Sequence, residues 1–416
     1  MAIAGQFSGW NYGLMSGGWG GLVAATVVTA TFYLGFVYCV AELAAAVQHG
    51  GGFDTYCRLA FGDVLGYLAG VSVLFALTAA LGVVGNFVAA YGRSVLGVAP
   101  LLTKLTLFGV VLVFQLRGVR EAANATLVIT AIAVAVLVLF SIAMIPFADP
   151  RNLIAENNTG LFTDGLRGVY HSIPFALWPL LGLEQAALAA EEAAEPARTM
   201  PRALLAAYLT LLVVFLGVVV FGPAGGGVEQ LRNADDPLYA ALTSPHAYGK
   251  PTLMAQCVGI GALIGLVATF FSVLYTSSRQ LYSLARAGYL PKWLTVINRR
   301  YVPHSALLVV SAFGLAAGVI SPEKVVVLVI FLLTISYFLV LLSFIRLRRK
   351  KPEMTRAYRA PGGLLTAAIT TALCVVVLTA CIAQQPTGML CALAVYALLT
   401  ASLWVKRFTE LARKAS

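Results

Sequence analysis

This sequence contains few charged residues, and their scarcity excludes most soluble folds. Only 11% of its 416 residues are Asp, Glu, Lys or Arg, whereas 60% are hydrophobic and the mean hydropathy is +0.88. Soluble domains are about one quarter charged. The longest polar connectors, 149–167 and 223–252, are only about 20–30 residues long, which is too short for a separate domain. We therefore expect an integral membrane protein.

Common catalytic and metal-binding motifs are also absent. The chain has no P-loop, no HExxH and no credible Ser/His/Asp order. Its six cysteines show no CxxC or Cys/His spacing, so neither disulfides nor a metal site are expected. The opening MAIAGQFSGW has no basic n-region and is not a signal peptide. It also lacks a polar tail ahead of its first apolar stretch, so we expect the natural start to lie upstream; the alternative is a half-length first helix. We expect no enzyme activity and no cofactor.

The hydropathy pattern predicts an all-α protein of about twelve membrane spans, because a spanning helix needs about 20 apolar residues. The first span is short. The expected spans are 2–15, 18–47, 64–92, 101–117, 122–147, 168–190, 203–222, 253–287, 304–320, 323–345, 363–383 and 387–405.

The net charge of +11 is unevenly distributed between the connectors. With both termini inside, 21 of the 28 Lys and Arg fall in cytoplasmic segments, seven of them within 346–359. This positive-inside bias predicts that both ends of the chain face the cytoplasm, in a cell inner membrane. A basic loop beside anionic lipid headgroups explains the charge, so no nucleic-acid partner is expected.

Two predicted spans contain helix-breaking residues. Span 2–15 is rich in glycine and polar residues, and span 168–190 contains Pro174, Pro179 and Gly182, which predict a break from Pro174 to Gly182. Five spans separate the starts of these two, so the second unit would be inverted relative to the first. We expect a single domain with a 5+5 inverted repeat, its units at about 1–147 and 168–345, followed by two further helices at about 363–405.

A broken membrane helix exposes backbone carbonyls at one side of the break and N–H groups at the other. Carbonyls attract a protonated amine, and N–H groups attract a carboxylate. Such breaks are where secondary transporters bind substrate. In the first span we expect Ala4, Gly5, Gln6 and Ser8 to bind substrate; the alternative is a glycine-rich packing face.

The second predicted break contains Trp178, Pro179 and Gly182. The Trp178 ring can close over a cationic ligand through a cation–π contact, or it can be an ordinary packing aromatic. Glu184 follows this break and can titrate during transport, or it can tie the two broken spans together. Glu42 near the inner end of its span is expected to be a packing or partly solvated carboxylate.

Span 253–287 carries hydroxyl side chains that suit either of two roles. Ser272, Thr276 and Ser277 can coordinate Na⁺, or they can bond to their own helix backbone. Span 122–147 contains no lysine.

Several of these segments resemble one family. GLEQAALAAEEAAEPARTMPRA resembles the sixth-helix signature of the amino acid–polyamine–organocation permeases, SSRQLYSLARAGYLPKWL the end of their eighth span, and FQLRGVREAANA their loop between spans four and five. GQFSGWNYGLMSGGWGGL together with YCVAELAAAVQHGGG is most similar to the ethanolamine permease subgroup. The resemblance covers essentially the whole chain.

The resemblance implies roles for individual residues. Ala4, Gly5 and Gln6 match the substrate-binding break of the first helix, and Trp178 the aromatic that covers substrate. Ser272 and Val273 lie near the contact from the eighth span, and Glu184 matches the acidic residue after the sixth-helix break. Two departures matter: Gln6 stands where ethanolamine permeases usually have an acid, and the span-five lysine of some proton-coupled members is missing.

We therefore predict a permease for an amino acid or a small amine such as ethanolamine. It would work by alternating access as a symporter or exchanger, coupled to H⁺, with Na⁺ as the alternative. A permease-like sensor that binds an amine without moving it is the competing hypothesis.

Overall fold

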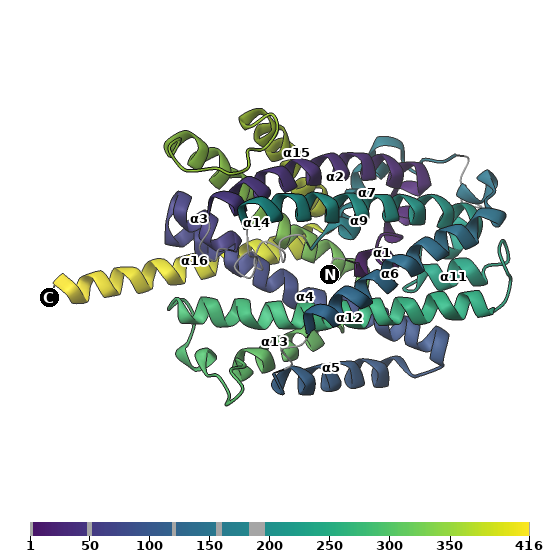
Figure 1. Cartoon of the computed structure of the whole chain (residues 1–416), viewed down its shortest axis with the longest axis horizontal. Helices are drawn as coiled ribbons and strands as arrows, with labels where there is room; N and C mark the ends of the chain where they lie inside the picture. The colour runs from purple at the N-terminus through teal and green to yellow at the C-terminus, as the bar shows by residue number, and fades with distance from the viewer. Residues whose placement is uncertain (1–2, 48–51, 119–121, 155–159, 183–195, 416) are drawn as a thin grey trace.

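The computed structural model describes residues 3–47, 52–118, 122–154, 160–182 and 196–415, which fold into helices and connecting turns without a β-strand (Figure 1). The all-α membrane fold is thus confirmed. The α-helices are α1 (Ala4–Phe7), α2 (Tyr12–Ala46), α3 (Phe53–Phe61), α4 (Asp63–Leu96), α5 (Pro100–Leu116), α6 (Ala122–Met144), α7 (Gly165–Leu177), α9 (Pro196–Gly226), α10 (Val228–Leu231), α11 (Pro237–Thr243), α12 (Leu253–Arg286), α13 (His304–Ala317), α14 (Pro322–Lys350), α15 (Leu364–Gln384) and α16 (Pro386–Ala415). Short 3₁₀ turns lie at η1 (Ile145–Phe147), η2 (Pro150–Leu153), η3 (Trp178–Leu180) and η5 (Lys292–Thr295).

Among the described residues, seven helices are long and apolar enough to cross a membrane: α2, α4, α6, α9, α12, α14 and α15. Three shorter apolar helices, α5, α13 and the first part of α16, accompany them. Together these ten coincide with ten of the predicted spans. The remaining two, 2–15 and 168–190, are the spans predicted to be broken.

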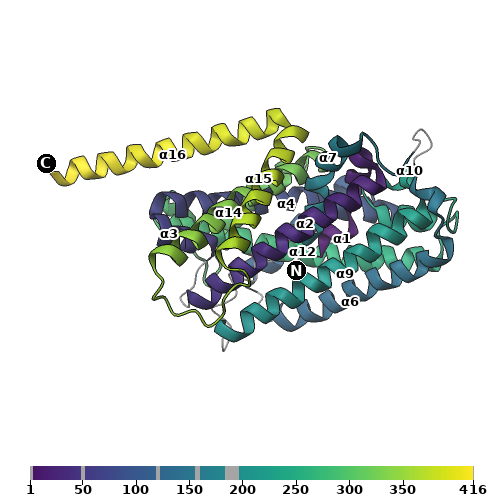
Figure 2. The same ribbon diagram turned by 90° about the horizontal axis from the view of Figure 1, so that it is seen from above.

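The membrane-crossing helices run along the long axis of the molecule, and α4 lies at their centre (Figures 1 and 2). Of the most apolar stretch of α4, 78% is buried, because it packs against α12, α13 and α14. One end of the bundle carries α3 and the loop 351–363, and we call it the basic end. The opposite end carries α10 and α11, and we call it the α11 end. The last helix, α16, projects past the others at the basic end.

Helix α2 changes direction near its start. Gly18 has a φ of +67° and separates the first turns of the helix from the long remainder. The backbone at this kink bonds to a neighbouring loop: Gly20 N donates to Leu161 O (2.8 Å) and Thr163 N donates to Gly17 O (3.0 Å). The predicted boundary between spans 2–15 and 18–47 falls at this kink.

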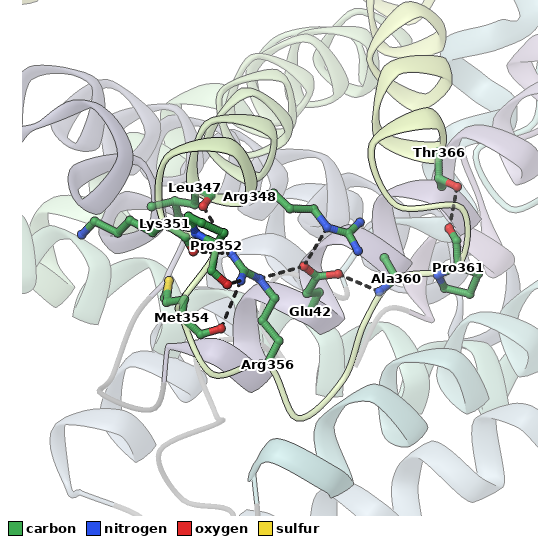
Figure 3. A network of polar contacts seen from close by, with 10 residues as sticks. All are labelled: Glu42, Leu347, Arg348, Lys351, Pro352, Met354, Arg356, Ala360, Pro361 and Thr366. Carbon is green, nitrogen blue, oxygen red and sulfur yellow. Dashed lines mark hydrogen bonds and ion pairs between the residues drawn. The ribbon is translucent and has the colours of Figure 1, made fainter.

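At the basic end, the buried carboxylate of Glu42 holds the loop after α14 (Figure 3). Its Oε1 is paired with Nε of Arg356 at 3.1 Å and with Nε of Arg348 at 3.6 Å, and its Oε2 accepts the backbone N–H of Ala360 at 2.7 Å. Arg356 in turn donates to the carbonyl oxygens of Leu347, Lys351, Pro352 and Met354. Of the two roles expected for Glu42, the structure supports that of a packing carboxylate.

Candidate functional site

The first helix is interrupted one turn later than predicted. Ala4, Gly5 and Gln6 are helical in α1, and the regular helix stops at Phe7. Ser8 is extended (φ −163°, ψ 161°) and Gly9 has a φ of +95°, a value that L side chains rarely adopt. Helix α2 begins at Tyr12, so the open backbone is 8–11 rather than 4–8. The break falls here because Gly9 supplies the left-handed conformation.

The second interruption begins later than predicted. Helix α7 continues through Pro174 as far as Leu177, tightens into the 3₁₀ turn Trp178–Leu180, and then becomes extended at Leu181. The prediction that the break starts at Pro174 is therefore wrong. Pro174 lies inside the helix, and Trp178 and Pro179 form its end. Gly182 has a φ of +120°. Glu184 lies outside the described residues, so its role stays a prediction.

These two helix ends touch each other inside the bundle. A Cβ on Gly5 would lie 2.8 Å from both the Cα of Pro179 and the carbonyl oxygen of Trp178. Only glycine allows the two backbones to approach so closely. The structure therefore brings together Gly5, Gln6 and Ser8 from the first break with Trp178 and Pro179 from the second.

Side chains cross this contact in both directions. Gln6 Nε2 donates to the carbonyl oxygens of Pro179 (3.0 Å) and of Leu211 (3.2 Å), and Trp178 Nε1 donates to Ser8 O (3.0 Å). Gln6 is fully buried, and its Oε1 has no hydrogen-bond partner. An unsatisfied buried acceptor costs about 1–3 kcal/mol. It is therefore a ready acceptor for an N–H group that enters the site.

Two carbonyl groups at the end of α1 accept hydrogen bonds from aromatic side chains. The hydroxyl of Tyr91, from α4, donates to Phe7 O at 2.9 Å, and the Trp178 indole holds Ser8 O. These are the carbonyls that a protonated amine would otherwise bind. Sequence reasoning missed Tyr91. Its only sequence signal is a tyrosine hydroxyl in an apolar span, which requires a buried partner.

The connector 228–238, which includes α10, lies over the first break from the α11 end. Asn11 Nδ2 donates to the carbonyls of Leu231 (2.7 Å) and Ala234 (2.8 Å), and Ser8 Oγ donates to the carbonyl of Asp235 (2.8 Å). The Tyr12 hydroxyl donates to the carboxylate of Asp235. Sequence reasoning noted Asn11 only as a polar residue of its span, and it missed Asp235. This connector covers the break and fixes its conformation.

Helix α12 packs against α1, the helix that precedes the first break. A Cβ on Gly265 would lie 2.6 Å from the ring of Phe7, so α12 packs against α1 at this point. Ser272 and Val273 lie seven and eight residues further on, which is about two turns of helix or 10 Å along the axis. Their role in binding stays a prediction.

Two of the three hydroxyls predicted either to coordinate Na⁺ or to bond to their own helix, those of Thr276 and Ser277, donate within α12. Thr276 Oγ1 donates to Ser272 O (2.9 Å), and Ser277 Oγ donates to Val273 O (2.7 Å). These are the i−4 backbone bonds that such residues commonly form in helices. Both hydroxyl protons are therefore engaged within α12.

Known proteins provide an independent comparison. Residues 2–407 match the sequence profile of the family described as amino acid permease. An uncharacterized transporter of Rhizobium meliloti is 26% identical, over 97% of this chain and 88% of that protein. The methylthioribose transporter of Bacillus subtilis is 24% identical, over 85% of this chain and 81% of the other. The branched-chain amino acid permease BcaP of the same organism is 23% identical, over 82% and 77%.

Proposed function

Because this chain belongs to the amino acid permease family, we propose that it carries an amino acid or a small amine by alternating access, through the contact between its two helix breaks. Its similar proteins are named as transporters and permeases, and the chain is a multi-pass membrane transporter. The observation that carries the proposal is the approach of Gly5 to Pro179, which joins two interrupted helices inside the bundle. In a membrane, interrupted backbone is tolerated only where protein or a cavity satisfies it.

In this mechanism, the substrate replaces bonds that the protein now makes to itself. A protonated amine takes the carbonyl of Ser8 from the Trp178 indole and also reaches the free Oε1 of Gln6. The displaced indole then covers the amine with its face, in a cation–π contact. Since Gln6 is neutral, the site has no carboxylate at this position to demand a strongly cationic substrate. We therefore place amino acids ahead of ethanolamine as substrates.

The remaining parts of the proposal concern topology and coupling. We place the basic end in the cytoplasm of a cell whose inner membrane holds the protein, because the segment 346–359, the end of α14 and the loop after it, contains seven Lys and Arg. The units at about 1–147 and 168–345 form an inverted repeat, and 363–405 lies outside it. Proton coupling through Glu184 is the proposed drive. Na⁺ coupling is the alternative, since the oxygens of Thr276 and Ser277 keep their lone pairs when their protons bond within α12.

Uptake into proteoliposomes tests this function directly. The full chain is reconstituted, and the entry of radiolabelled L-leucine, L-alanine, L-methionine and ethanolamine is measured with and without an inward pH gradient and an inward Na⁺ gradient. We expect saturable uptake of at least one amino acid, stimulated by the pH gradient. Saturable binding without uptake would favour a sensor that binds an amine and does not move it. Neither binding nor uptake of any of these compounds would contradict the proposal.

A further inference from the structure

A cleft of about 480 Å³ opens at the α11 end, beside the connector that covers the first break. It is lined by the last turns of α4, the start of α5, the connector residues Asp235 and Asp236, and the turn 318–322 between α13 and α14. The volume lies in the range of small-molecule sites. The topology proposed above places this cleft on the outer side of the membrane.

Four charged side chains line this cleft, two of each sign. Arg93 and Lys104 carry positive charges, and Asp235 and Asp236 carry negative charges. None of the ion pairs found in the described part of the chain joins one of these cations to one of these carboxylates. Opposite charges that share a cleft without pairing leave both signs available to a ligand that carries both.

The polar groups around these charges are only partly satisfied by the protein. Asn86 is 7% exposed; its Nδ2 donates weakly to Ile320 O (3.5 Å), and its Oδ1 is buried without a hydrogen-bond partner. Lys104 Nζ is anchored to the carbonyl of Gly318 at 3.2 Å, which fixes its position on the wall. Asn86 Oδ1 is therefore a free buried acceptor in a cleft that also holds two carboxylates, and an ammonium group has three donors for such acceptors.

A bound cation would stabilise the charged form of the Asp236 carboxyl group in the cleft. Burial raises the pKa of the Asp236 carboxyl, because desolvation disfavours its charged form, although a hydrogen bond from Ser94 partly offsets this. An ammonium group beside Asp236 would restore the lost stabilisation of the charge. Asp235 is held by Tyr12 and accepts Ser8 Oγ at its carbonyl, so it connects the cleft directly to the first break.

We propose that this cleft is a second ligand site, which holds a zwitterionic amino acid with its ammonium at Asp235, Asp236 and Asn86 and its carboxylate at Arg93 and Lys104. The inference rests on the proposed function, since it treats the cleft as a waiting position before the central site. The ammonium group of a bound amino acid competes with the Tyr12 hydroxyl for the carboxylate of Asp235. Binding therefore weakens the contact that holds the connector over the first break. Recognition depends on the two charged groups shared by all amino acids and not on the side chain.

Protection from alkylation tests the site with glycine, which has both charges and no side chain. The probe position is Ser321→Cys, an exposed lining residue whose hydroxyl makes no cap bond. Full-length protein is treated with N-ethylmaleimide, and labelling of residue 321 is followed by peptide mass spectrometry. We expect about 20 mM glycine to slow labelling about threefold or more, as suits a solvent-exposed site of millimolar affinity. Ethanolamine and acetate, which each carry one of the two charges, should protect much less.

Three variants in the Ser321→Cys background separate the cleft from the central site. Arg93→Gln with Lys104→Gln, and separately Asp236→Asn, should abolish protection by glycine, whereas Trp178→Ala should leave it intact. Protection that survives the charge variants, or that disappears in Trp178→Ala, would overturn the second site. If glycine gives no protection in a protein that still takes up amino acids, the second ligand site is refuted and the proposed transport function stands. Absence of uptake in proteoliposomes would refute the proposed function instead.

Discussion

Gly5 is the residue at which the two broken helices come closest. A methyl group there would overlap the backbone of Pro179 and the carbonyl of Trp178, each at 2.8 Å. Backbone atoms cannot move aside as a flexible side chain can, so Gly5→Ala should force the breaks apart. We expect uptake to fall about tenfold or more, since overpacking costs about 1–3 kcal/mol.

The matched control for this change is Gly109→Ala in α5. A Cβ on Gly109 would meet no atom within 4 Å, so it adds a methyl group to a helix without a clash. Helix propensity favours alanine there by up to about 1 kcal/mol. Uptake by Gly109→Ala should match that of the unmodified protein. Equal uptake by the Gly5 and Gly109 variants would show that the close approach has no functional importance.

Trp178 joins the two breaks through its side chain. Trp178→Ala removes both the hydrogen bond to Ser8 O and the ring proposed to cover the ligand. These interactions are worth about 1–2 kcal/mol, so we expect the dissociation constant of the transported amino acid to rise about tenfold with expression unchanged. Equilibrium dialysis measures the affinity. Trp178→Phe, which keeps a ring, should lose less; unchanged affinity in the alanine variant would remove Trp178 from the site.

Single residues were predictable where their type is unusual for a membrane span. Gly5, Gln6, Ser8, Trp178 and Pro179 stood out in sequence because they are glycine, proline, polar or aromatic residues within apolar stretches, and the structure brings them together. The partners that come from other helices were not predictable. Tyr91 and Asp235 lie far from the breaks in sequence, and only the packing of α4 and of the connector brings them to the first break.

At the scale of elements, Glu42 of α2 fixes the loop that follows α14. Glu42→Ala leaves Arg356 and Arg348 without their carboxylate and the N–H of Ala360 without its acceptor. Loss of one partner of a buried pair costs about 3–5 kcal/mol. We expect a clear fall in the Tm of the purified protein, measured by thermal unfolding in detergent.

An exposed glutamate of the same loop provides the control for this prediction. Glu353→Ala removes a carboxylate at the surface and should change Tm little, because surface charges contribute about 0–1 kcal/mol. The Tm of Glu42→Gln should lie between those of Glu42→Ala and Glu353→Ala, since its amide oxygen can still accept the hydrogen bond from the N–H of Ala360. If both alanine variants melt at the same temperature, the network is not a stabilising element.

Helix existence was more predictable from sequence than helix interruption. Apolar runs of about 20 residues identify spans directly, because lipid requires them. The interruptions depend on local backbone geometry, and proline proved a poor guide to it: α7 continues through Pro174, whereas the first helix stops where Gly9 takes a positive φ. A proline is tolerated inside a membrane helix when neighbouring groups satisfy the carbonyl that it leaves free.

At the scale of the whole molecule, the charge distribution predicts which end faces the cytoplasm. In a background of Cys257→Ser and Cys391→Ser, which removes the exposed cysteines of the described residues, Lys250→Cys should react with a membrane-impermeant maleimide in intact cells. Glu353→Cys should react only after the membrane is opened. The positive-inside bias is the reason for this expectation. The reverse pattern of labelling would show the opposite topology, with the charged cleft on the cytoplasmic side.

The architecture as a whole followed from composition and hydropathy, but its interior did not. Sequence indicates how many apolar segments there are and how they alternate across the bilayer. It does not indicate that α4 occupies the centre or that α12 meets α1 at Gly265. Those contacts depend on side-chain fit between helices, for which small residues such as Gly265 are permissive and not specific.

The phenol group of Tyr91 couples the first break to the connector that covers it. The hydroxyl of Tyr91 donates to Phe7 O at 2.9 Å and accepts the backbone N–H of Leu238 at 3.4 Å. A single oxygen atom therefore links the last residue of α1 to the start of α11, beside the connector that covers the first break. Neither segment can move relative to the other without losing a hydrogen bond to this atom, so a movement of the connector would be coupled to the first break.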